Sequence, residues 1–164
     1  MITVSGHNDL VCYGDNGEVV RVVCELYERW QEQPREALAA ELYGITTEEA
    51  CGRIFEYLVE NVRYKLDTYG CQYIKSPARL IADGQGDCKS LTMFLACCLH
   101  CLGISHIIRF VNFDNSNQFS HVYCVALDHG KEIILDACEL DSAGRPMFNY
   151  ARPYAKKQDF VYYE

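Results

Sequence analysis

The sequence predicts an α+β fold in which helices come first and a meander of antiparallel strands follows. In the first third of the 164-residue chain, apolar side chains recur three and four residues apart, which is the period of a helix. Later segments, ISHIIRFV, HVYCVAL and KEIILDA, are rich in β-branched or aromatic residues and are separated by polar turns. Between these two parts the run CKSLTMFLACCLHCLG is apolar on nearly all sides, which is typical of a central helix packed on a sheet.

Two helices are expected near the N-terminus. The first runs from about Asn16 to Gln33, and Asp15 with Glu18 three residues later resembles a capping box at its start. The segment PREALAAEL then permits a second helix, because proline is favoured in a first helical turn. Gly44 is expected to end it.

The next helices lead to a turn rich in glycine. Thr46 and Glu49 form another capping box, before a helix that should reach about Asn61. A short helix, ARLIA, follows Ser76-Pro77, and the run Asp83-Gly84-Gln85-Gly86 forms a turn directly before the central helix. FVYY is a candidate last strand, and DSAGRPMFNYARPYAKKQ is the expected long surface loop.

Composition indicates one globular domain over residues 1–164, with a helical part at about 1–62 and a core at about 63–164. Hydrophobic residues make up 49% of the chain and charged residues 23%, which excludes a disordered protein. The net charge of −8 argues against a nucleic-acid binder, since such proteins need a cationic surface. No stretch is apolar for long enough to cross a membrane.

Ten cysteines raise the question of a disulfide framework. They lie mostly inside apolar helical or strand patterns, and the start MITVSGHNDL lacks the basic and apolar segments of a signal peptide. We therefore expect reduced thiols and a cytoplasmic protein.

One cysteine is placed for chemistry. Cys88 follows the glycine turn at the start of the central helix, where the helix dipole and unpaired N–H groups stabilise a thiolate. Asp87 would cap the helix, and the Cys88 N–H would be free to donate to an oxyanion. Taken alone, Cys88 could equally be a buried packing residue.

His121 and Asp136 complete a candidate triad. His121 begins the strand HVYCVAL and Asp136 ends the strand IILDA. If these strands pair through the turn Asp128-His129-Gly130, the two residues lie at similar distances from the turn and become near neighbours. The carboxylate could then orient the imidazole, and the imidazole could serve as base for Cys88.

A second sulfur-rich group could in principle bind zinc. Cys97, Cys98, His100 and Cys101 have suitable ligand types. On one continuous apolar helix, however, their side chains point in several directions, so we interpret the cysteines as packing residues. No metal and no cofactor are expected.

The sequence resembles the transglutaminase-like superfamily. The resemblance lies in VRYKL, in SPARLIADGQGDCKSLTMFLACCLHCLGI with its Gly-Asp-Cys turn and Leu-Gly-Ile, in SHVYCVAL and in KEIILDA. The resemblance covers roughly Ile54 to Ala137. The chain is similar in particular to small members of the family that are encoded in phages and prophages. It implies a papain-like core and a Cys88, His121 and Asp136 triad.

The same resemblance implies a side-chain donor for the oxyanion hole, commonly a glutamine or an aromatic residue. CQYIKSPARL offers Gln72 and Tyr73, of which we favour Gln72 because its amide is a neutral donor. Where the family often has a tryptophan after the catalytic histidine, this chain has Val122 and Tyr123. That departure leaves the substrate class open.

The leading hypothesis is a thiol enzyme that forms an acyl-enzyme at an amide carbonyl of a peptide or protein. A peptidase, amidase or deamidase is favoured over a transglutaminase, because nothing in the chain marks a site for an amine. The alternative is a non-catalytic binding or assembly module that keeps the fold. The sequence leaves the oligomeric state open.

Overall fold

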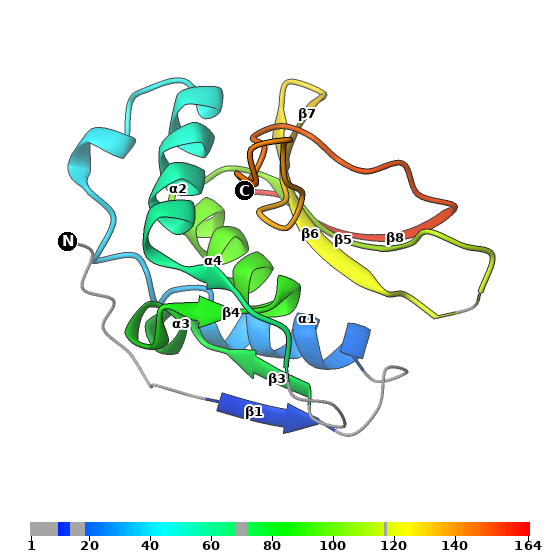
Figure 1. The fold of residues 1–164 in the computed structure, drawn as a ribbon. Helices are drawn as coiled ribbons and strands as arrows, with labels where there is room; N and C mark the ends of the chain where they lie inside the picture. Colours follow the sequence, from blue (N-terminus) through cyan, green and yellow to red (C-terminus); the bar gives the residue numbers. More distant parts are fainter. Residues whose placement is uncertain (1–9, 14–18, 68–71, 117) are drawn as a thin grey trace.

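The computed structural model describes residues 10–13, 19–67, 72–116 and 118–164. Its strands alternate with helices in the first half and form a meander in the second half (Figure 1). The elements are β1 Leu10–Tyr13, α1 Val19–Trp30, η1 Ala40–Leu42, α2 Thr47–Asn61, β2 Arg63–Tyr64, β3 Gln72–Lys75, α3 Pro77–Asp83, β4 Gln85–Gly86, α4 Cys88–Cys101, β5 His106–Asn112, β6 His121–Asp128, β7 Lys131–Leu135 and β8 Lys156–Tyr162.

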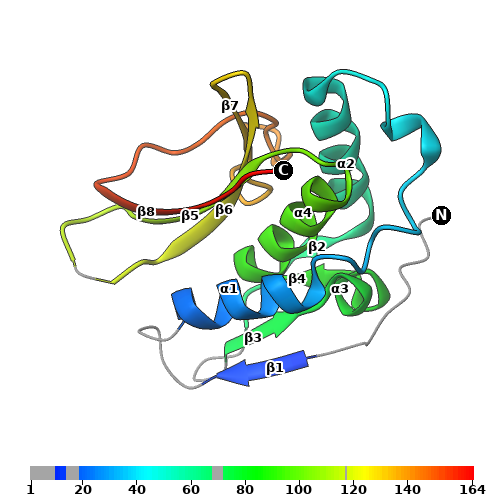
Figure 2. The same ribbon diagram turned by 180° about the vertical axis from the view of Figure 1, so that it is seen from behind.

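Helix α4 is the centre of the fold. Twelve of its fourteen residues are buried. It contacts α1, α2 and α3 on one side and β5 and β6 on the other, so it lies between the helical layer and the sheet (Figures 1 and 2). Packing on all sides explains why this helix lacks a polar stripe.

The four-stranded sheet has the order β7-β6-β5-β8, and every neighbouring pair is antiparallel. Ile108, Phe110 and Cys124 belong to the core shared with α4, whereas Ile107 and Val125 belong to a smaller cluster. The predicted meander of three strands and the α+β class are therefore confirmed. FVYY lies within and just after β8, which pairs with β5 at the far side of the meander.

The helix starts follow the predicted caps where the structure describes them. Thr46 accepts a hydrogen bond from the Glu49 N–H at 3.2 Å, and the Glu49 carboxylate accepts one from the Thr46 N–H. Helix α2 ends at Asn61, as predicted. Helix α1 ends at Trp30, three residues before the expected end, and its proposed cap at Asp15 and Glu18 lies outside the described residues.

The helix predicted over PREALAAEL is wrong. Residues 31–37 form turns, and the only helical part of this segment is the short 3₁₀ segment η1. Pro34 and Leu38 are its buried residues, and Leu38 is the one that joins the core cluster. Because a short helix needs tertiary packing of an apolar face to be stable, one buried leucine does not suffice.

Two small sheets flank the start of α4. Strands β1 and β3 pair antiparallel, and β2 pairs with β4 in parallel. The β2–β4 pair fixes the segment directly before Cys88. Within the described part of the chain, no helix is both long and apolar enough to span a membrane.

Candidate active site

Cys88 is the first residue of α4 and is partly buried. The Asp87 carboxylate caps the helix by accepting a hydrogen bond from the Lys89 N–H at 3.1 Å. Lys89 is itself buried and forms ion pairs with Asp87 and, at 3.6 Å, with Asp67. Burial raises the pKa of Asp87 despite the Lys89 charge, so this cap depends on the lysine beside it.

The turn before Cys88 needs a glycine at position 86. A Cβ atom on Gly86 would lie 2.6 Å from Leu80 Cδ1 and 3.1 Å from Ser90 Cβ. Lys75 holds the same turn from β3, because its Nζ donates to the Gln85 carbonyl at 2.7 Å. The backbone leading to Cys88 is therefore fixed by close packing and by a charged hydrogen bond.

His121 and Asp136 lie together, His121 as the first residue of β6 and Asp136 as the residue that directly follows β7. His121 Nε2 is 2.7 Å from Asp136 Oδ2. The other carboxylate oxygen accepts a hydrogen bond from the Cys138 N–H at 3.1 Å, and the Asp136 side chain is only 2% exposed. The register pairs Asp128 with Lys131, which brings the two strand ends to the same place.

The third partner of this arrangement is Cys88, which lies close enough to His121 to raise the pKa of the imidazole. Since Asp136 occupies Nε2, the imidazole nitrogen left for the thiol is Nδ1. Burial lowers the pKa of His121, but the hydrogen bond to Asp136 and the proximity of Cys88 outweigh burial and raise this pKa to about 10. The site favours a protonated imidazole.

Three aromatic side chains also belong to the site, and two of them, Phe113 and Tyr64, were not singled out from the sequence. The Phe113 ring stacks on the His121 ring with centroids 5.9 Å apart, and the Tyr123 ring lies 5.8 Å away. On the helical side, Tyr64 pairs with Gly86 across β2 and β4. Burial raises the pKa of the Tyr64 phenol, and nearby Cys88 raises it further.

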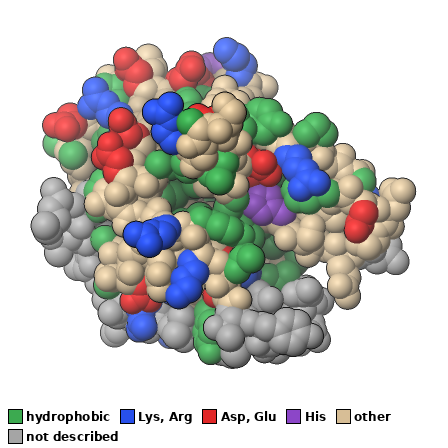
Figure 3. All heavy atoms as spheres, in the orientation of Figure 1, with side chains coloured by type: hydrophobic (Ala, Val, Ile, Leu, Met, Phe, Trp, Pro, Cys, Tyr) green, Lys and Arg blue, Asp and Glu red, His purple; other side chains and the backbone are tan. Residues whose placement is uncertain are grey.

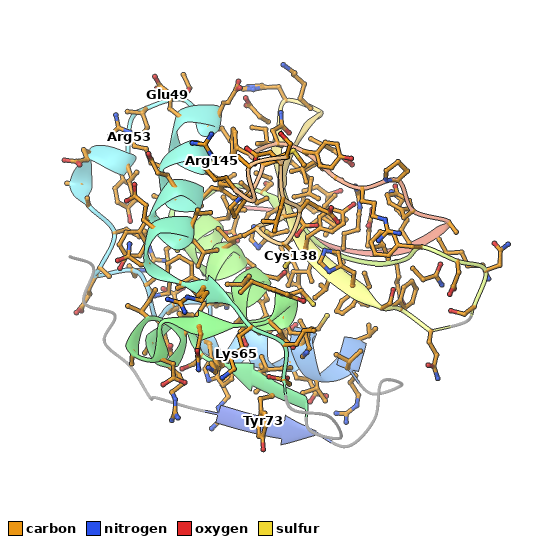
Figure 4. All side chains as sticks on the ribbon, in the orientation of Figure 1. Glu49, Arg53, Lys65, Tyr73, Cys138 and Arg145 are labelled. Atoms are coloured by element: carbon orange, nitrogen blue, oxygen red, sulfur yellow. The ribbon has the colours of Figure 1, made fainter. Side chains whose placement is uncertain are left out.

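Cys138 is a second thiol at the site, and Figure 4 shows it between α4 and the sheet. Burial raises its pKa far above the usual range, and the proximity of Cys88 and Asp136 adds to the effect. A thiol in these surroundings stays protonated, so it is a poor nucleophile. The sequence shows that Cys138 follows Asp136 by two residues, but it does not show that the turn after Asp136 brings the Cys138 thiol to the site.

Side chains of the types that bind metals also lie close together here. Among the described residues, His121, Asp136 and Cys138 place one ligand atom each within 4.8 Å of one another. In the same described part of the chain, the cysteines of α4 form no such group. Cys97 and Cys98 are fully buried, and His100 instead bonds Glu32 at 2.7 Å and Glu164 at 2.6 Å.

The two candidate oxyanion donors lie on β3. Tyr73 points away from the labelled Cys138, toward the edge formed by β1 (Figure 4). The side chain of Gln72 lies outside the described residues. The structure thus brings Cys88, His121 and Asp136 together without Tyr73.

Figure 3 shows the surface on this face of the molecule, where histidine atoms reach solvent between the helical layer and the sheet, among hydrophobic side chains.

The sequence of residues 33–140 matches the transglutaminase-like domain family. The chain belongs to this family. We find no match among curated proteins.

Two solved structures resemble this transglutaminase-like protein. A proposed protease from Parabacteroides distasonis superposes with a TM-score of 0.60 at 14% identity, over 76% of this chain and 27% of the other. A proposed cysteine protease from Cytophaga hutchinsonii gives a TM-score of 0.45 at 12% identity, over 92% of this chain and 53% of the other. The chain therefore spans about a quarter and about half of these proteins, and the first likeness shows a shared fold.

Proposed function

We propose that this transglutaminase-like protein is a thiol enzyme that cleaves an amide bond through Cys88, His121 and Asp136. The observation that supports this most is the placement of Cys88 beside His121, whose imidazole is hydrogen bonded to the buried Asp136. Cys88 begins α4, His121 begins β6 and Asp136 directly follows β7, and each is held by further contacts of its own. Such a geometry is what a nucleophile, its base and an orienting group require.

In the first half of the proposed reaction, the Cys88 thiolate attacks the substrate carbonyl carbon. The tetrahedral oxyanion would form beside the first turn of α4, where the Cys88 N–H is available as a donor. His121, protonated at Nδ1, then gives its proton to the leaving amine nitrogen as the C–N bond breaks. An acyl-thioester on Cys88 and a neutral His121 remain.

In the second half, neutral His121 takes a proton from water while the water oxygen attacks the thioester carbonyl. Expulsion of the Cys88 thiolate releases a carboxylic acid and restores the starting state, in which the Cys88 thiolate faces a protonated His121. Asp136 holds the imidazole through Nε2, so that Nδ1 faces the sulfur in both halves. Water rather than an amine is the proposed acceptor, because it needs no binding site of its own.

The proposed substrate class is a peptide or protein amide. Screening purified protein against peptide libraries and cell-wall fragments, with mass detection of released peptide or ammonia, would identify the amide. Cys88→Ala should abolish turnover. The matched control is Cys24→Ala, which removes another half-buried thiol on α1.

The alternative is a binding or assembly module with the same fold. Turnover that survives in Cys88→Ala would contradict the proposed nucleophile. Binding of a peptide without turnover, covalent adduct or dependence on Cys88 would favour the module instead.

A further inference from the structure

Arg152 lies beside the candidate active site on the segment that precedes β8. The segment is anchored at both ends. The Asn149 N–H donates to the Ile134 carbonyl at 3.0 Å, and the Ala155 N–H donates to the Asn112 carbonyl at 2.9 Å. Pro153 follows Arg152 and restricts the Arg152 backbone to extended conformations. The position of Arg152 is therefore set by the fold.

Two ring contacts connect Arg152 to His121. The guanidinium carbon of Arg152 lies 4.1 Å from the centroid of the Phe113 ring. Phe113 in turn stacks on His121, with centroids 5.9 Å apart and planes inclined by 30°. The guanidinium carbon therefore lies within about 10 Å of the imidazole centroid. A hydrogen bond at each end and one substrate residue of about 3.5 Å together span roughly that distance.

The hydrogen-bonding edge of Arg152 is open. Its side chain is exposed, and among the described residues no carboxylate pairs with it. Arg109, by contrast, is bound at 2.8 Å by both Glu132 and Asp159. A guanidinium stacked on an aromatic face keeps its in-plane N–H donors free for a carboxylate.

The proposed reaction determines which part of a substrate lies near Arg152. His121 protonates the leaving amine, so that amine must lie on the His121 side of the scissile bond. Arg152 lies near this end of the site, because it contacts Phe113, which stacks on the His121 ring. A chain with a net charge of −8 repels anions in general, so a local cation is needed where an anionic group is to bind.

We propose that Arg152 binds a carboxylate on the leaving-amine side of the scissile amide. The preferred substrates then have a free C-terminal carboxylate or an acidic side chain on the residue after that bond. This inference rests on the proposed function, in which Cys88 attacks and His121 protonates the leaving group.

Charged and neutral alkylating probes test the proposal without knowledge of the substrate. One pair is N-iodoacetylglycine and its amide, which differ by an α-carboxylate. The other pair is the α-amides of N-iodoacetyl-glutamate and N-iodoacetyl-glutamine, which differ by a side-chain carboxylate. The measurement is the rate of Cys88 alkylation by each probe, followed by peptide mapping, and the charged-to-neutral ratio for each pair.

For at least one pair, this ratio should fall by about three- to tenfold in Arg152→Gln, the size expected for one partly solvated charge pair. A larger fall for the glycine pair would identify a C-terminal carboxylate as the bound group. A larger fall for the glutamate pair would identify an acidic side chain. Arg152→Lys should retain part of the ratio. Arg53→Gln on α2, far from the labelled Cys138 in Figure 4, removes the same charge and should leave the ratio unchanged.

An unchanged ratio for both pairs in Arg152→Gln would overturn the proposal, and so would an equal fall in Arg53→Gln. Because each ratio compares two probes on the same thiol, a general change in Cys88 reactivity cancels. Slow alkylation of Cys88 by every probe would instead count against the proposed function, while the ratios would still report on Arg152.

Discussion

The Thr92 hydroxyl donates a hydrogen bond of 3.1 Å to the carbonyl oxygen of Val122. Thr92 lies one turn after Cys88 on α4, and Val122 follows His121 on β6. The bond is buried and joins the helical layer to the sheet next to the two residues proposed to react. Together with the packing of α4 on the sheet, it sets the distance between the helix that begins at Cys88 and the strand that begins at His121.

Thr92→Val should slow alkylation of Cys88 by iodoacetamide by about tenfold, because a small displacement of a reacting pair is costly. It should also lower the free energy of unfolding by about 1–2 kcal/mol, since it removes a buried hydrogen bond. Thr92→Ser keeps the hydroxyl and should restore the rate. A Thr92→Val protein that alkylates as fast as wild type would show that the bond does not position Cys88.

Cys88 should be alkylated first among the ten cysteines near neutral pH. Cys138 should react slowly although it lies at the same site, because burial raises its pKa. Peptide mapping after brief exposure to iodoacetamide measures both. The nucleophile would be misassigned if Cys138, Cys12 or Cys71 were modified well before Cys88.

Gly86→Ala should lower the free energy of unfolding by about 1–3 kcal/mol, because its Cβ would overlap the buried Leu80 side chain. Since the same turn leads into Cys88, alkylation of Cys88 should slow as well. Chemical denaturation and alkylation rates measure the two effects. Gly144→Ala is a useful comparison: a Cβ there meets nothing within 4 Å, although its φ of +78° makes an alanine strained. A Gly86→Ala protein with wild-type stability and rate would contradict the packing argument.

The stability of the protein should depend on the protonation of His121. Its pKa is raised from 6.5 to about 10 in the folded state, so its contribution is complete below pH 6.5 and is lost as the pH rises through about 10. The free energy of unfolding of wild type, relative to His121→Ala, should therefore fall between pH 7 and 10 by on the order of 1 kcal/mol per pH unit. Denaturation curves at several pH values test this, and parallel pH profiles would exclude a raised pKa.

Helices could be predicted from the sequence where the local residue pattern matches the way the segment is buried in the fold. Helix α4 is apolar all round because it is packed all round, and the Thr46 capping box begins α2 as its residue types require. The segment after Pro34 shows the limit. Its helical propensity is good, but propensity alone does not hold a short helix that buries a single leucine.

The site divides in the same way. A nucleophile at a helix start and a hairpin that pairs two strand ends are local features, so Cys88, His121 and Asp136 could be proposed from the sequence. Phe113, Tyr64 and Arg152 could not, because loops and a two-stranded parallel sheet bring them to the site. Such contacts have no periodic signal in the sequence.

The most direct test of the account is the pH dependence of Cys88 alkylation by iodoacetamide, in wild type and in His121→Ala. If His121 stabilises the thiolate, wild-type Cys88 reacts rapidly at pH 6–7, and His121→Ala slows that reaction by at least about tenfold while leaving the fold intact. Asp136→Asn should act in the same direction less strongly, because it weakens the orientation of the imidazole. Identical rate profiles for wild type and His121→Ala would show that Cys88 and His121 do not act as a pair, and the proposed catalytic mechanism would be wrong.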